Sequence, residues 1–225
     1  ALVYYLAAQR RPVNRERLLA LFWPDHDQTA ARQLLRAALH GVRRAVGPII
    51  EGEEDLAISR DVEVDYRALA DAVTAPAVDE ATLAGALARY RDDLLAGFTL
   101  PDAAPFDEWL AVEREQARLL AVRGYTRLAR IASVRSDVAA ALTALDRALA
   151  FDPLQEDLQR EAIRLLYLAG DRVGAIRRYE QFRDLLDAEL GVPPMRATRD
   201  LYDAIVTDRL HADPPGVRCP ADMSE

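Results

Sequence analysis

Short apolar stretches separated by turn residues make up the N-terminal part of the chain. Residues 1–8 are apolar and helical in period. Pro12-Val13 predicts a short extended piece, because proline disfavours helix at the residue before it. Asn14 suits the N-cap of a second helix over residues 15–23, which Pro24-Asp25 ends. The pattern therefore predicts two short helices with an extended piece between them.

A third, longer amphipathic helix is predicted from Asp27 or Gln28 to Ala45 or Val46, where Gly47-Pro48 stops it. Its apolar positions recur every three or four residues, and we expect this stripe to face the core: Leu35, Leu39, Val42 and Val46. Two short strands around the acidic turn 51–55 follow, and strict alternation over 62–65 predicts another extended piece. This is the order of elements in a winged helix–turn–helix.

From residue 79 onward the pattern is helical throughout. The predicted helices span 79–95, 105–132, 137–150, 155–168, 171–190 and 194–210. Asp79 and Asp137 suit N-caps, and glycines or prolines fall at the breaks. Residues 74–77 are the expected linker between the two parts of the chain.

Within this helical part, residues 136–153 and 170–187 repeat one pattern 34 residues apart. The matched pairs are Ser136-Asp137 with Gly170-Asp171, Ala141 with Ala175, Leu145 with Tyr179, and Ala148 with Phe182. This is the length of a tetratricopeptide unit, two antiparallel helices whose small residues let them cross closely. Such repeats present a concave surface to partners, so the pattern indicates recognition rather than catalysis. The matched residues are expected in the core, and Arg177-Arg178 on a solvated face.

Charge is unevenly distributed along the chain. The net charge is −8, yet residues 1–49 hold eight arginines against three acidic residues. A local basic segment can bind nucleic acid even in an acidic protein. No stretch is long and apolar enough for a membrane span, and the single cysteine, Cys219, favours a reducing cytoplasm. The chain begins without Met inside an apolar helix, which suggests a fragment.

Many ordered matches give the chain a resemblance to the bacterial transcriptional activator domain family, of the type found in antibiotic-pathway regulators. In the N-terminal part the resemblance rests on 11–18, on Phe22-Trp23-Pro24-Asp25, and on 31–47. In the helical part it rests on 90–98, 101–102, 106–110, 113–115, 147–153 and 189–194. It covers nearly everything from residue 1 to about residue 210.

The resemblance implies a mainly α fold in three parts. Residues 1–66 would form a winged helix–turn–helix with a small β-hairpin wing, lacking its first strands. Residues 67–210 would form a tetratricopeptide-like, all-helical domain, and we expect 211–225 to be disordered. Members bind promoter double-stranded DNA, often as homodimers, and engage RNA polymerase or another regulator. The expected protein is therefore a cytoplasmic transcriptional regulator, an activator in class, with no enzyme activity, cofactor, metal or membrane partner.

The exposed face of the third helix carries the candidate DNA contacts. They are Arg32, Gln33, Arg36, His40, Arg43 and Arg44. Arginine, glutamine and histidine can reach base edges in a major groove, whereas arginines near the helix end suit phosphates. We expect Arg36 and Gln33 to discriminate between sequences and Arg43 and Arg44 to bind all DNA alike.

Other features favour a different class, a helical-repeat interaction or oligomerisation module with a degenerate winged helix. Leu34 and Ala37 stand where family members often have polar residues, and Gly41 replaces a common arginine. The wing tip 51–55 is acidic and would repel a duplex. Catalysis has little support, because the three histidines show no metal-ligand spacing and Cys219 has no nearby base.

Overall fold

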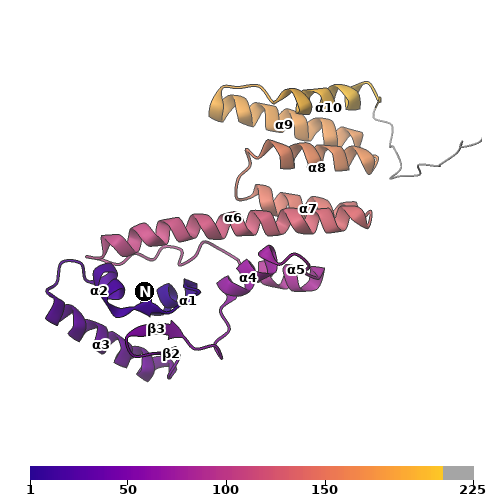
Figure 1. The fold of residues 1–225 in the computed structure, drawn as a ribbon. Coiled ribbons are helices and arrows are strands. Elements are labelled where there is room, and N and C mark those ends of the chain that lie inside the picture. Colours follow the sequence, from indigo (N-terminus) through magenta and orange to yellow (C-terminus); the bar gives the residue numbers. More distant parts are fainter. Residues whose placement is uncertain (210–225) are drawn as a thin grey trace, which may run out of the picture. The chain divides into compact units, whose positions relative to one another are not determined.

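The computed structural model describes residues 1–209 and divides the chain into two compact units, residues 1–128 and residues from 129 onward. The predicted fold class is confirmed: the chain is mainly helical, with one small antiparallel sheet (Figure 1). No helix within residues 1–209 is long and apolar enough to cross a membrane. The disorder predicted for 211–225 lies outside the described residues.

The first unit begins with the elements of the winged helix. They are α1 (Leu2–Ala8), β1 (Val13–Asn14), α2 (Arg15–Phe22), α3 (Gln28–Val46), β2 (Ile50–Glu51) and β3 (Asp55–Ile58). The sheet order is β1-β3-β2, with Val13 opposite Leu56 and Ile50 opposite Ile58. Asn14 accepts a hydrogen bond from the Glu16 amide, as its N-cap role predicted. The predicted order of helices, extended piece and hairpin is confirmed.

The rest of the first unit is helical. It comprises α4 (Asp65–Thr74), α5 (Glu80–Arg89) and most of α6 (Ala104–Val134). Phe106 and Leu110 of α6 are buried in the same core as α1, α2 and α3. The Phe106 ring lies 5.2 Å from that of Phe22, and Trp109 packs edge-on against Tyr5 at 4.7 Å. Because α6 completes this core, the winged helix does not pack alone; the predicted division at residue 66 stays a prediction.

Two predictions for the first unit hold only in part. Val64 has the extended backbone predicted for 62–65, but these residues join no strand, and Asp65 is already the first residue of helix α4. The helix predicted over 79–95 ends at Arg89. The irregular segment that follows is stabilised by Arg114, which donates to the carbonyl oxygens of Leu94, Leu95 and Phe98.

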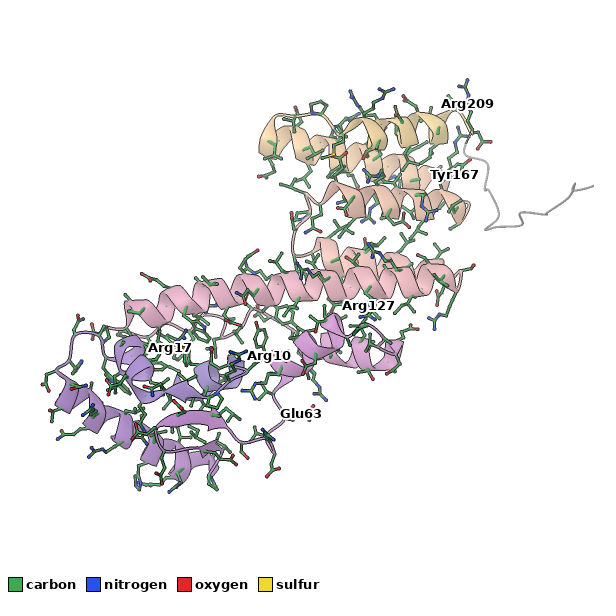
Figure 2. The ribbon with its side chains drawn as sticks, viewed as in Figure 1. Arg10, Arg17, Glu63, Arg127, Tyr167 and Arg209 are labelled. Atoms are coloured by element: carbon green, nitrogen blue, oxygen red, sulfur yellow. The ribbon has the colours of Figure 1, made fainter. Side chains whose placement is uncertain are left out.

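The loop between α4 and α5 is also fixed by an arginine of α6. Nη1 of Arg127 donates to the Ala75 carbonyl at 2.6 Å, and Nη2 donates to the Pro76 carbonyl at 3.0 Å (Figure 2). Gly124, one turn earlier, packs closely against the neighbouring helices, because an added Cβ would lie 2.8 Å from the Leu87 side chain and would force it to shift. Close packing and these hydrogen bonds join α4, α5 and α6 within the unit.

The second unit contains the end of α6 followed by α7 (Val138–Leu149), α8 (Glu156–Leu168), α9 (Arg172–Leu190) and α10 (Arg196–Val206). Figure 1 shows α8, α9 and α10 packed in sequence. The helix predicted over 194–210 is shorter, since it ends at Val206. Tyr179 of α9 stacks on Tyr202 of α10, with ring centroids 4.0 Å apart.

The 34-residue repeat is confirmed in its hydrogen bonds. Ser136 and Gly170 both adopt the left-handed conformation, with φ of 59° and 85°. The amides of Asp137 and Asp171 donate to carbonyl oxygens at the end of the preceding helix, and each carboxylate then caps the next helix. The matched residues at the other positions are all buried: Ala141 and Ala175, Leu145 and Tyr179, Ala148 and Phe182.

Candidate nucleic-acid interface

Residues at both ends of helix α3 define where the helix begins and where it ends. The Asp27 carboxylate accepts from the amides of Thr29 and Ala30. Gly47, with φ of 87°, ends the helix and Pro48 follows, as expected of a helix stop. Arg43 and Arg44 lie in the last turn, where positive charge complements the helix dipole. These ends set both the length of α3 and the side chains that it presents.

The burial of α3 falls steadily toward its C-terminus. Leu35 is 1% exposed, Leu39 and Val42 are half-buried, and Val46 is 60% exposed. The prediction that Val46 faces the core was wrong, since its side chain is exposed and does not pack against the core that buries Leu35. The C-terminal half of α3 is therefore more exposed to solvent than the predicted apolar stripe indicated.

The wing lies beside this half of α3. Gly52 turns the hairpin with φ of 100°, and a Cβ there would lie 1.9 Å from the Asp55 carbonyl oxygen, so the turn requires glycine. The Arg15 amide donates to the Glu54 carbonyl at 3.0 Å, and the Arg15 guanidinium bonds the Glu53 carbonyl. The acidic side chains of the tip are exposed, as the sequence predicted.

A pocket of about 280 Å³ opens between α3 and the wing. Its basic lining residues are Arg15, Arg36, His40 and Arg43, and Gly47 and Gly52 contribute to its rim. The structure thus brings three of the six predicted contacts, Arg36, His40 and Arg43, into one basic pocket. Sequence reasoning missed Arg15, whose role depends on β1 pairing with β3.

The other three predicted contacts lie elsewhere on α3. Arg32 is paired with Glu16 of α2, whereas Gln33 and Arg44 are exposed beyond the pocket lining. The Glu16 pKa is lowered by the hydrogen bond from Arg32 and by a second one from Gln28. Within residues 1–209, the side chains of Arg36, Arg43 and Arg44 have no ion-pair partner. These three guanidinium groups are available to an external anion.

Comparisons with known proteins give the class. The sequence pattern of the bacterial transcriptional activator domain matches residues 55–206. The chain therefore belongs to the bacterial transcriptional activator domain family, a family of transcriptional regulators. Comparison with curated proteins gave no match.

Among solved structures, the chain is similar to Mycobacterium tuberculosis EmbR, determined in complex with a low-affinity phosphopeptide. The TM-score is 0.64 at 19% sequence identity. The likeness covers 92% of this chain and 57% of the EmbR chain, so this chain spans little more than half of that protein. At this identity the comparison supports the fold, an EmbR-like arrangement of small sheet and helices.

Proposed function

We propose that the chain is a DNA-binding transcriptional activator that docks α3 on promoter double-stranded DNA. The observation that carries the proposal is the basic pocket between α3 and the wing, together with three guanidinium groups that have no ion-pair partner within residues 1–209. Arginine is the side chain best suited to phosphates and to guanine edges. An unpaired, exposed cluster of this kind binds anions without first breaking an internal ion pair.

The residues divide by position. Arg36 and Gln33 lie mid-helix and are assigned to base edges, whereas Arg43 and Arg44 in the last turn are assigned to phosphates. His40 joins the pocket, and Arg32 contributes least, since it is paired with Glu16. The helical repeats supply contacts to a second copy, to RNA polymerase or to another regulator. Under this proposal, the first unit recognises the DNA sequence and the second unit contacts other proteins.

A second candidate is a protein-interaction or oligomerisation module whose winged helix no longer binds DNA. The acidic, exposed wing tip favours it, because carboxylates beside a duplex oppose approach. Gly41, exposed on α3, favours it too, because glycine offers no side chain to a duplex and weakens the helix by about 1 kcal/mol relative to alanine.

A gel shift of the natural full-length protein against the DNA upstream of its own gene separates the two candidates. The activator predicts a shifted band whose affinity falls steeply with salt, because phosphate contacts release counterions. No shift, or a shift insensitive to salt, would favour the interaction module. The same assay on an unrelated duplex of equal length is the control for non-specific binding.

A further inference from the structure

A groove of about 370 Å³ in the second unit lies between α8 and α9. Its apolar lining includes the half-buried Leu166 and Leu185, above the buried Phe182. Its polar lining consists of Arg177, Arg178, Gln159 and Gln181, and no acidic side chain of residues 1–209 is among the lining residues. In a chain with a net charge of −8, this groove places two arginines beside partly exposed apolar side chains.

Arg178 does not lie on a solvated face, contrary to the sequence prediction. Its side chain is only 20% exposed. Nε donates to Oε1 of Gln159 at 3.0 Å, and Nη1 donates to Oδ1 of Asp146 at 2.8 Å. Gln159 is itself held by its bond to the Pro153 carbonyl. The guanidinium of Arg178 is therefore fixed before any ligand arrives, which lowers the entropy cost of binding.

Some hydrogen-bond donors in the groove remain unused after these bonds are formed. A guanidinium has five N–H groups, and the Nη2 group of Arg178 has no acceptor within the described residues. Arg177, the next residue, is exposed and has no hydrogen-bond or ion-pair partner for its side chain within residues 1–209. Two neighbouring guanidinium groups, one fixed and one exposed, match the planar geometry of carboxylates.

We propose that this groove binds an acidic peptide segment of a partner protein. Side-chain carboxylates of the peptide would pair with Arg177 and Arg178, and an apolar side chain would cover the half-buried Leu166 and Leu185. Charge complementarity carries the choice of partner, because two guanidinium groups and no acidic side chain of residues 1–209 line the groove. The inference rests on the proposed role of the helical repeats in partner contacts and names the chemistry of that contact.

The test uses the full chain and an array of synthetic peptides in which Glu is combined with Leu and Phe in every order. A matched array replaces each Glu with Gln. We expect the chain to bind a subset of the Glu peptides and not their Gln counterparts. The best Glu peptide is then labelled with fluorescein and titrated by anisotropy, and Arg177→Glu is expected to weaken its binding about tenfold or more.

Two further variants make the result specific. Gln181→Glu adds a negative charge to the exposed wall of the groove while leaving the bonds that hold Arg178 in place, and it should also weaken binding. Arg183→Gln is the matched control on the same helix, because Arg183 lies outside the groove and pairs with Asp184. Binding unchanged by Arg177→Glu, or weakened equally by the control, would overturn the proposal.

Each variant is also titrated with duplex DNA. The inference expects unaltered DNA affinity, and a loss of DNA binding in Arg177→Glu would assign the groove to nucleic acid and overturn it. No Glu preference anywhere in the array would overturn it as well. Because DNA binding depends on α3, failure of the wild-type chain to bind DNA would instead count against the proposed function.

Discussion

Nη2 of Arg32 lies 2.8 Å from Oε1 of Glu16, which joins the start of α3 to the start of α2. Gln28 donates to the other oxygen of the same carboxylate. Arg32 is thus the one predicted DNA contact that has an ion-pair partner among residues 1–209, while Arg36 and Arg43 have none. The six candidates are not equivalent, although the sequence presents them on one exposed face.

This pairing predicts an order of effects. Arg32→Ala should weaken DNA binding less than Arg43→Ala, because the Arg32 guanidinium must give up Glu16 to reach a phosphate. Both side chains are exposed, so folding is expected to be equal in the two variants. Fluorescence anisotropy with one promoter duplex measures the difference. An equal or larger reduction for Arg32→Ala would contradict the assignment.

A different readout applies to the middle of α3. Arg36→Ala and Gln33→Ala should reduce discrimination between the promoter and a scrambled duplex, because contacts to base edges carry sequence information. A good bidentate contact accounts for about 1–3 kcal/mol of discrimination. Competition binding with both duplexes measures it, with Arg44→Ala as the matched control. If Arg44→Ala alters discrimination as much as Arg36→Ala, the division between base and phosphate contacts is wrong.

Neutralising the wing tip should strengthen DNA binding. Glu53 and Glu54 are exposed, and their repulsion of a duplex is least screened at low salt. We expect Glu53→Gln with Glu54→Gln to raise affinity most in dilute buffer and little at high salt. Glu180→Gln with Glu189→Gln, at two exposed positions of α9, controls for the equal change in net charge. Unchanged affinity at low salt would place the wing away from the DNA.

The repeat predicts a stability change with opposite signs at its two copies. Ser136 and Gly170 share the left-handed conformation, which glycine adopts without strain. Ser136→Gly should stabilise the fold by about 0.5–1 kcal/mol, and Gly170→Ala should destabilise it by about 1 kcal/mol. Chemical denaturation of both variants measures this. The same sign for both would show that the two turns are not equivalent.

Local patterns predict the elements whose ends are set by adjacent residues. Asn14, Asp27, Asp79, Asp137 and Asp171 all cap helices, and their partners lie within three residues. The repeat is readable for the same reason, since the turn and its cap recur together. Where an element depends only on residues close to it in the chain, the sequence is sufficient to predict it.

Interactions between residues distant in sequence account for the elements that local patterns miss. The helix predicted to reach residue 95 stops at Arg89, and the following segment takes its hydrogen bonds from Arg114 on α6. Val46 is exposed, whereas Leu35 is buried in the core and Leu39 packs against it. The spacing of apolar residues along the chain reveals neither the hydrogen bonds of Arg114 nor the extent of the core.

The candidate sites show the same limit. The sequence places Arg36, His40 and Arg43 on an exposed face, but the pocket they form needs the wing and Arg15 beside them. Arg178 has the sequence pattern of a solvated charge, yet Asp146 and Gln159, on two other helices, hold it in place. Sites built from several elements require the packing as well as the pattern.

The salt dependence of DNA binding is the sharpest test of whether α3 docks on DNA. Affinity for the promoter duplex is measured over a range of salt concentrations for the wild-type chain and for Arg43→Gln with Arg44→Gln, beside Arg183→Gln as the control. If α3 contacts phosphates, the logarithmic slope falls by about 0.9 for each phosphate that the α3 variant no longer neutralises, and it stays unchanged in the control. An α3 variant with the wild-type slope and affinity would contradict docking through α3.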